Sequence, residues 1–314
     1  MPAEGIHLTA LREALAAPGL GASARRRIVR AEDAARLGAL LVDLPYFDHY
    51  LGEVVRYALG VTARPSPWGA LLHDGGAVAL LGGLLDVARA EPEPTVGAIA
   101  LGLASHLAID RALHPLVNAL ARAHPHGDLA SSHREVEKFQ SICFHEAYLG
   151  RDLMGDPGIS RHLTIELVGA LDRPALARPI RAAFTAAFGR APSARELARL
   201  GRGYRAHTRL LGSRLGRRIA PPAAKDAARP RYLHGAWGTF ADHLASAVTA
   251  SLPVIDAAAA VLDADRGDVA AAHAALARVL PAGTIDPAGD DVDLGRPFVV
   301  ELPRGGAAAP VDAA

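Results

Sequence analysis

Three side chains that commonly bind metal ions recur at four-residue intervals near the middle of the first half of the chain. They are His106, Asp110 and His114, in the sequence Ser-His-Leu-Ala-Ile-Asp-Arg-Ala-Leu-His-Pro. Each four-residue step turns an α-helix through about 400°, so the three side chains would project from one stripe about 80° wide. Two imidazoles and a carboxylate suit a borderline divalent ion such as zinc. Because the flanking residues are apolar, where an unpaired aspartate is costly, we favour a metal site over a hydrogen-bonded core triad.

A second pair of ligand-type residues with helical spacing follows shortly after this stripe. His133 and Glu137 lie four residues apart, a spacing typical of helical metal sites. The sequence Ser-His-Arg-Glu over residues 132–135 predicts a capping box at the start of their helix. Further candidate ligands precede the stripe, at His7, Asp43 and His73. Together these side chains are enough for two or three metal ions with open coordination positions.

Composition predicts the elements that must position these residues. Half of the 314 residues are hydrophobic but only 5% are aromatic, so the core must consist mainly of Ala, Leu and Val, which favours helices. We therefore expect an all-α fold, a multi-helix bundle. Residues 1–150 would form the metal-binding helical core, and residues 151–280 would add helices packing on it, with a loop over 218–231. Pro, Gly and Asp dominate residues 281–314, which predicts an extended or disordered tail.

Charge and cysteine content limit the function classes. The net charge of +1 gives no support for general nucleic-acid binding, and Arg25 to Arg27 are expected to be a solvated surface cluster. Cys143 is the only cysteine, so no intrachain disulfide can form. The N-terminus lacks the features of a signal peptide, and the longest apolar stretches fall short of about 20 residues. We therefore expect a cytoplasmic protein without a transmembrane anchor.

The metal-ligand pattern resembles that of a known family, the bacterial zinc-dependent phospholipases C, whose fold relatives include single-strand nucleases. The resemblance rests on Gly-Leu-Ala-Ser-His-Leu-Ala-Ile-Asp-Arg-Ala-Leu-His-Pro over residues 102–115, followed by His133-x-x-x-Glu137. The family pattern is a His-x-x-x-Asp helix, another His, and then His-x-x-x-Glu on the next helix. The similarity covers roughly residues 1–150.

This resemblance implies a multi-helix bundle with a metal cluster in a cleft, usually of three zinc ions. Carried over position by position, Asp43, His73, His106 and Asp110 would hold one ion. A second ion would be held by His114, His133 and Glu137. Asp110 would bridge towards a third ion that takes His7 as its side-chain ligand. The chain departs from the secreted members of the family in two ways: six residues precede His7, where those enzymes use the mature N-terminal residue itself, and the interval from Asp110 to His114 is shorter.

The implied function is a metal-dependent hydrolysis of phosphoric esters or diesters, phospholipase C-like, on a small-molecule or lipid substrate. Two ions about 3.5–4 Å apart can lower the pKa of a bound water and clamp a phosphoryl oxygen. Asp43 could also act as a general base on that water. The carboxylates of Asp48, Asp74 and Glu135 are candidates for orienting the ligand imidazoles.

Three alternatives remain open at this point. The same ligands could hold iron in a di-iron oxidoreductase, and manganese also suits part of the set. A non-enzymatic helical protein with a closed, structural metal site is a second alternative. The adjacent His73 and Asp74 also match the dyad of the His-Asp-domain phosphohydrolases, with His49 or His7 and Asp110 as the remaining ligands.

Several other histidines and aromatic residues are expected to have structural roles. His145 and Glu146 lie on the helix after Glu137 and are candidates for core hydrogen bonding. His234, Trp237, Asp242 and His243 are expected to form a capped helix start rather than a substrate contact. The aromatic residues Tyr46, Phe47, Tyr50 and Trp68 are more often core than pocket lining.

Overall fold

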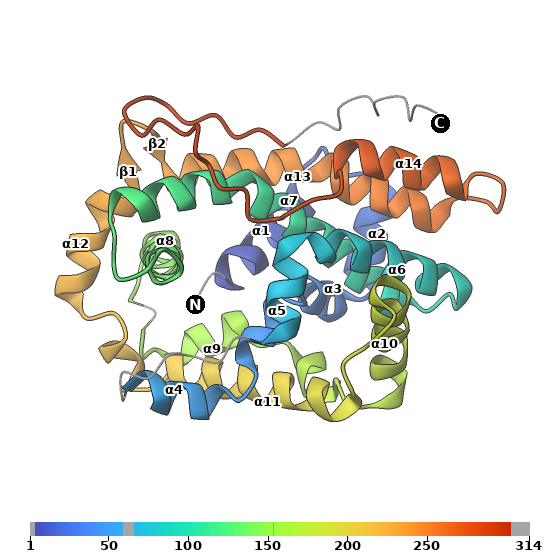
Figure 1. The fold of residues 1–314 in the computed structure, drawn as a ribbon, viewed down its shortest axis with the longest axis horizontal. Coiled ribbons are helices and arrows are strands. Elements are labelled where there is room, and N and C mark those ends of the chain that lie inside the picture. Colours follow the sequence, from blue (N-terminus) through green and yellow to red (C-terminus); the bar gives the residue numbers. More distant parts are fainter. Residues whose placement is uncertain (1–3, 59–65, 153, 303–314) are drawn as a thin grey trace, which may run out of the picture.

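The protein folds into an almost entirely helical assembly, which confirms the predicted all-α class. The computed structural model describes residues 4–58, 66–152 and 154–302. Figure 1 shows the helices stacked around a long central helix, α7. The first half of the chain contains α1 (Glu4–Ala16), α2 (Ala22–Arg30), α3 (Glu32–Gly38), η1 (Leu44–Phe47), α4 (Tyr50–Ala58), α5 (Pro67–Leu71), η2 (Leu72–Gly76), α6 (Ala77–Ala90), α7 (Pro94–Ala123) and α8 (Leu129–Leu149).

The second half continues with helices that pack directly on the first half: α10 lies on α6, and α13 lies along α7. The segment expected to be a loop over 218–231 instead contains α12, which begins with a proline in its first turn. The elements are α9 (Pro157–Leu163), η3 (Glu166–Ala170), α10 (Pro174–Phe188), α11 (Ala194–Leu211), η4 (Gly216–Arg218), α12 (Pro222–Tyr232), a hairpin of β1 (His234–Gly235) and β2 (Gly238–Thr239), α13 (Phe240–Asp263) and α14 (Val269–Val279).

Helix α7 is the central element because it is buried on all sides. Its N-terminus has Pro94 in the first turn, and its sequence is rich in Ala and Leu, which favour helix. Helices α3, α6, α8 and α13 all pack against it. A helix surrounded by other helices is expected to be apolar around its whole circumference, so the polar stripe on α7 needs partners inside the protein.

Two glycines allow α3 to lie unusually close to α7. A Cβ atom at Gly102 would lie 1.9 Å from the carbonyl oxygen of Ala35, and one at Gly38 would lie 2.0 Å from that of Ile99. Only glycine permits such an approach of two backbones. The close crossing brings the chain just after α3 against the side chains that α7 presents.

Residues 281–302 form neither helix nor strand but lie in contact with the core. In Figure 1 this segment runs across α7 and α13 as a dark red coil. Arg122 of α7 donates to the carbonyl oxygens of Ala288 and Gly289, at 2.8 and 2.6 Å. The predicted tail is therefore irregular over this part, as expected, but it is bonded to the bundle. The rest of the predicted tail, 303–314, lies outside the described residues.

Three helical segments of the described residues are long and apolar enough to cross a membrane, judged by length and composition. They are 67–90, 94–123 and 240–263. The most apolar window of 94–123 is 100% buried inside the protein, whereas those of 67–90 and 240–263 are 39% and 56% buried. The predicted absence of a transmembrane anchor therefore stays a prediction.

Candidate metal centre

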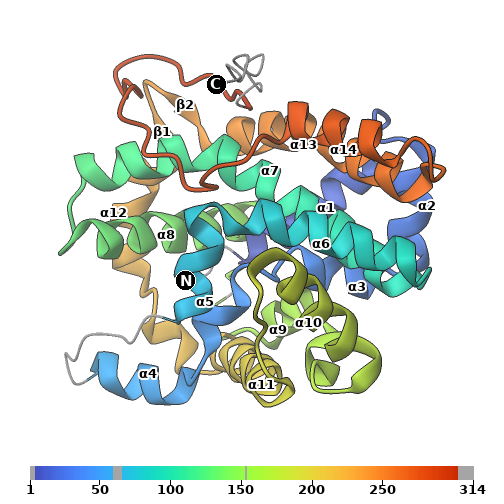
Figure 2. The ribbon, with the colours of Figure 1, turned by 45° about the vertical axis from the view of Figure 1, so that its right-hand side comes forward.

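The eight predicted ligands come from five parts of the chain and meet beside α7. His7 is on α1, Asp43 lies in the turn before η1, and His73 is on η2. The remaining five are on α7 and α8: His106, Asp110, His114, His133 and Glu137. Figure 2 shows α1, α5, α7 and α8 surrounding this region. An unbroken series of short side-chain distances joins all eight residues, so the structure brings together the whole predicted set.

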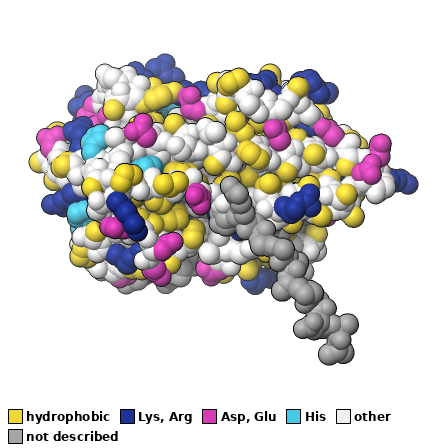
Figure 3. Space-filling view, turned by 90° about the horizontal axis from the view of Figure 1, so that it is seen from above, with side chains coloured by type: hydrophobic (Ala, Val, Ile, Leu, Met, Phe, Trp, Pro, Cys, Tyr) yellow, Lys and Arg dark blue, Asp and Glu magenta, His cyan; other side chains and the backbone are white. Residues whose placement is uncertain are grey.

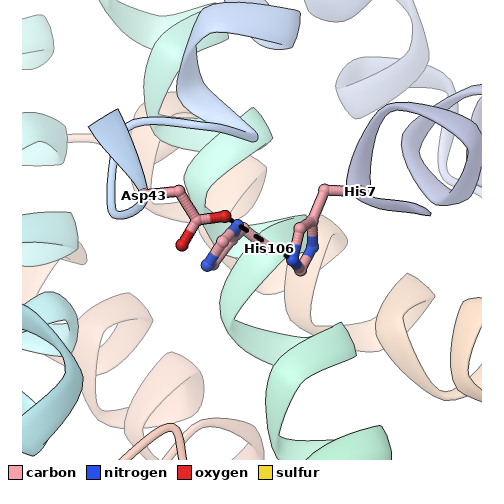
Figure 4. A group of neighbouring side chains, drawn as sticks. All are labelled: His7, Asp43 and His106. Carbon is pink, nitrogen blue, oxygen red and sulfur yellow. Dashed lines mark ion pairs between the residues drawn. The ribbon is translucent and has the colours of Figure 1, made fainter. Parts of the chain in front are cut away.

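One group consists of His7, Asp43 and His106, whose ligand atoms all lie within 4.8 Å of one another. Figure 4 shows the three side chains converging from α1, from the turn before η1 and from α7. The rings of His7 and His106 stack with centroids 3.9 Å apart. His73 adjoins this group, with its Nε2 3.5 Å from Asp43 Oδ1. His7 therefore lies beside Asp43 and His106, and the predicted third ion at His7 and Asp110 stays a prediction.

The second group consists of His114, His133 and Glu137, again with ligand atoms within 4.8 Å of one another. Glu137 Oε1 lies 3.5 Å from His114 Nε2 and 3.4 Å from His133 Nε2. Helix α8 begins earlier than the predicted capping box: Asp128 is the N-cap and accepts from the Ser131 amide. His133 and Glu137 nevertheless share a face, because the helix runs continuously through both.

Asp110 lies between the two groups. Its Oδ2 is 2.9 Å from His106 Nε2, while its Oδ1 is 3.2 Å from His7 Nε2 and 3.5 Å from His114 Nε2. The i, i+4, i+8 spacing on α7 produces this arrangement, since it places Asp110 one turn from each histidine on the same stripe. A single carboxylate in this position can contribute an oxygen to each group.

Backbone carbonyls fix the orientation of three of the imidazoles. The Nδ1 of His106 lies 2.8 Å from Ala39 O, that of His73 lies 2.9 Å from Gly69 O, and that of His114 lies 3.0 Å from Ile285 O. A carbonyl oxygen can only accept, so each Nδ1 is the donor, and in the neutral imidazole each Nε2 then carries the lone pair. The Nε2 atoms all face carboxylates of the cluster. This is the tautomer that binds metal through Nε2.

His133 is oriented by a side-chain relay that includes the C-terminal segment. Its Nδ1 lies 2.7 Å from Asn118 Oδ1. The amide nitrogen of Asn118 donates in turn to Asp286 Oδ1 at 2.6 Å and to the carbonyl of Pro287 at 2.9 Å. Asp286 also lies 3.3 Å from His114 Nδ1. Residues far apart in sequence thus hold both histidines of the second group.

Two buried nitrogen atoms of the first group, His106 Nε2 and His7 Nδ1, have no hydrogen-bond partner among the described residues. The lone pair of His106 Nε2 faces the Asp110 carboxylate at 2.9 Å, which is unfavourable unless a proton or another cation lies between them. A divalent ion with imidazole and carboxylate ligands satisfies both groups. The donor set therefore fits a metal ion, and binding itself stays a prediction.

The pKa shifts of the histidines and carboxylates also show that the cluster favours bound positive charge. Burial alone would lower the pKa of His106, but Asp110 and Asp43 outweigh it and raise that pKa to about 9. Burial likewise disfavours charged His114, yet Asp110 and Glu137 raise its pKa to about 10. Burial would raise the pKa values of Asp110 and Glu137, and the surrounding histidines hold both well below their usual range. The carboxylates therefore stay ionised at neutral pH.

A small cavity of about 30 Å³ opens beside the ligands. His7, Asp110, His114 and Glu137 form its polar wall. Gln140 and five apolar side chains form the rest of the lining: Ile6, Ile109, Leu113, Val117 and Phe240. Space of about 10–15 Å³ is enough for one water molecule, so the cavity has room for water next to the carboxylates.

The orienting groups differ from those predicted. Asp48 pairs with Arg199, Glu135 pairs with Lys138, and Asp74 is exposed. The His73–Asp74 dyad is therefore not formed: His73 faces Asp43 instead. It lies in η2 at a kink between α5 and α6, where Asp74 and Gly75 leave the helical conformation and Gly75 adopts φ 108°. A positive φ of this kind is readily adopted only by glycine.

The residues expected to be structural are largely so. His145 and Glu146 are buried and bonded to Thr9 and Lys225. His243 Nε2 lies 2.9 Å from the carbonyl of buried Trp237, and Thr239 caps α13. Tyr46 differs, because it is 41% exposed and its hydroxyl lies 3.3 Å from His73 Nδ1, at the edge of the cluster.

Comparisons with known proteins add no assignment. The chain matches no protein-family model, no curated protein and no solved structure.

Proposed function

We propose that the protein is a metal-dependent hydrolase of phosphoric esters that uses two or three zinc ions at the cluster around Asp110. The resemblance to zinc-dependent phospholipases C suggested this function from the sequence. The observation that carries the proposal is the common orientation of His73, His106, His114 and His133. Each has its Nδ1 held by an acceptor and its Nε2 directed at a carboxylate.

A bound pair of divalent ions would lower the pKa of a water molecule and polarise a phosphoryl oxygen. The protein's own contribution is to place and hold the ligands. His7, Asp43 and His106 would hold one ion, and His114, His133 and Glu137 the other, with Asp110 between them. Burial raises the pKa of Asp43, but His106, His73 and His7 outweigh it and leave that pKa below its usual value. Asp43 is therefore better suited to bind metal than to accept a proton.

The cavity favours a site with an open position over a closed structural site. A structural zinc site is filled by four protein ligands, whereas a catalytic site leaves a position for water or substrate. The space beside Asp110, His114 and Glu137 provides such a position. The proposed substrate class is a small-molecule or lipid phosphoester, and the proposed location is the cytoplasm.

The test is a hydrolysis assay with protein reconstituted with zinc, manganese or iron. Bis-p-nitrophenyl phosphate reports diester hydrolysis, p-nitrophenyl phosphate reports monoester hydrolysis, and p-nitrophenylphosphorylcholine reports phospholipase C-like hydrolysis. His106→Ala should lose both the metal and the activity, while the exposed control His234→Ala should keep both. Full activity in His106→Ala would refute the proposal.

The same preparation separates the alternatives. A visible absorption band that depends on iron, together with oxygen uptake, would indicate a di-iron oxidoreductase. A retained metal ion with no turnover and no water-accessible position would indicate a structural metal.

A further inference from the structure

Residues 194–218 carry a large positive net charge, although the net charge of the whole protein is only +1. Residues 194–218 contain eight of the 34 basic residues and one of the 33 acidic ones, so this segment carries a net charge of +7 and the rest of the chain −6. The segment comprises α11 and η4. Codon bias can explain why the basic residues are arginines, but not why they gather here without acidic neighbours.

The arginines of α11 share one exposed face. Arg202, Arg205 and Arg209 are exposed, while Leu200, Tyr204 and His207 on the opposite side are buried. Helical geometry explains the separation: the three arginines span a sector of about 60°. Arg214, Arg217 and Arg218 continue the charge just past the end of the helix and are also exposed. We call these six arginines the basic face.

Within the described residues, no ion pair neutralises the basic face. The salt bridge of this region belongs to Arg199, whose guanidinium contacts Asp48 at the side of α11. Figure 3 shows the far side of the molecule, above α13 and α14, where acidic and basic side chains are intermingled. Unpaired like charges on one face repel one another, so the basic face gains most from an anionic surface outside the protein.

Exposed apolar side chains occur on the helix that packs against α11 and among the arginines that follow α11. Helix α4 packs on α11 and presents Leu51 and Val55 to solvent, with 66% and 58% of their surfaces exposed. Leu215, between Arg214 and Arg217, is 58% exposed. Figures 1 and 2 both place α4 and α11 along the lower edge of the molecule. Arginines beside protruding aliphatic side chains are typical of surfaces that bind anionic membranes, whereas nucleic-acid interfaces are more polar.

We infer that the basic face, together with the exposed side chains of Leu51, Val55 and Leu215, docks the protein on the surface of an anionic lipid bilayer. The arginines contact lipid phosphates, and the aliphatic side chains enter the boundary between headgroups and acyl chains. This surface is physically linked to the metal centre. The chain runs from Asp43 through η1 to α4. Helix η1 is in close backbone contact with α11, as shown by Gly203, where a Cβ atom would lie only 1.9 Å from Phe47 O. The inference nevertheless does not depend on the proposed hydrolase function.

Vesicle flotation with the full chain tests the inference. Vesicles of phosphatidylcholine with added phosphatidylglycerol should bind the protein, and vesicles of phosphatidylcholine alone should not. Each arginine near an anionic surface contributes about fivefold to binding, so Arg202→Gln/Arg209→Gln should weaken it by roughly 10- to 30-fold. The control Arg266→Gln/Arg278→Gln removes the same charge from exposed arginines around α14 and should leave binding unchanged.

A second variant separates a lipid surface from other polyanions. Leu51→Gln/Val55→Gln keeps every charge and should still weaken vesicle binding several-fold, since it removes the aliphatic contacts. Circular dichroism at matched temperatures checks that each variant is folded. Absence of binding to anionic vesicles would overturn the inference. So would equal binding to a short DNA duplex with no effect of Leu51→Gln/Val55→Gln, which would identify a nucleic-acid site. Neither readout requires metal or turnover, so failure of the hydrolase proposal would leave this result interpretable.

Discussion

Two groups of buried or half-buried histidines lie on opposite faces of α1, and the pKa shifts found in one group are opposite in direction to those in the other. His7 faces the metal centre, where His106 and His114 have pKa values raised to about 9 and about 10. Gly5 and Thr9, on the other face, adjoin His145 and His162. There, burial lowers the pKa of His145, and burial together with His145 lowers that of His162 to about 4.

The difference comes from the partners rather than from the burial. His145 is bonded to the hydroxyl of Thr9 at 2.9 Å and to the carbonyl of Ser141 at 2.7 Å, so both of its nitrogens are satisfied by neutral groups. His106 and His114 instead have Nδ1 bonded to a backbone carbonyl and Nε2 aimed at the Asp110 carboxylate. The two groups of histidines therefore differ in whether a carboxylate faces the second ring nitrogen.

The largest expected effect is at the carboxylate that joins the two metal groups. Asp110→Asn keeps the size of the side chain but removes the charge that faces His7, His106 and His114. Loss of a group that merely orients a ligand costs about 10- to 100-fold in metal affinity, so loss of this ligand should exceed about 100-fold. Titration with zinc against a chromophoric chelator measures it. Asp86→Asn, at an exposed carboxylate, should retain wild-type affinity; unchanged affinity in Asp110→Asn would refute the bridging role.

The next effect concerns the relay from the C-terminal segment. Asn118→Ala frees His133 from its fixed orientation and also removes the bonds to Asp286 and Pro287. We expect zinc affinity to fall about 10- to 100-fold, because the ligand imidazole must be ordered at the moment of binding. The affinity is measured well below the unfolding temperature, so that loss of stability is not mistaken for loss of metal. An affinity within twofold of wild type would show that the relay does not position His133.

The neutral histidines should affect stability and leave the metal untouched. His145→Ala removes two buried hydrogen bonds and leaves a cavity, which should lower the free energy of unfolding by about 2–4 kcal/mol. Its metal content should match that of wild type, while that of His114→Ala should be reduced. Urea denaturation and elemental analysis provide the two readouts. A reduced metal content in His145→Ala would break the distinction between the two groups.

The smallest effect is a pH dependence at His162. Its folded-state pKa of about 4 lies below the usual 6.5, so the unfolded chain binds a proton that the folded protein does not. The corresponding stability is complete above about pH 6.5 and is lost as the pH falls towards 4. We would measure the free energy of unfolding of wild type and of His162→Asn across this pH range. The difference between the two isolates the contribution of His162 from those of other titrating groups. A difference that does not change with pH would show that His162 titrates normally.

The parts of this molecule that could be predicted from sequence are those determined by local spacing. The stripe at His106, Asp110 and His114 and the pair at His133 and Glu137 each follow from the helical period. That the two sets meet was implied by the family resemblance and not by the spacing. Composition was sufficient for the helical class. The start of α8 was placed too late because Asp128 caps the helix in preference to Ser132.

The groups that orient the ligands could not be predicted, because backbone atoms and distant segments supply them. Ala39 O reaches His106 through the close crossing of two glycines, and a carbonyl leaves no mark in the sequence. Asp286 belongs to a segment whose composition indicates disorder, yet it bonds Asn118. The basic face was hidden for a different reason, since a net charge of +1 averages over regions of opposite charge.

The most direct test of the central claim is the metal content of the wild-type protein, purified without an affinity tag and analysed by plasma mass spectrometry. With two ligand groups and a bridging Asp110, we expect at least two divalent ions per chain, with zinc predominating. Protein that retains no metal after reconstitution with zinc, iron or manganese would contradict the account.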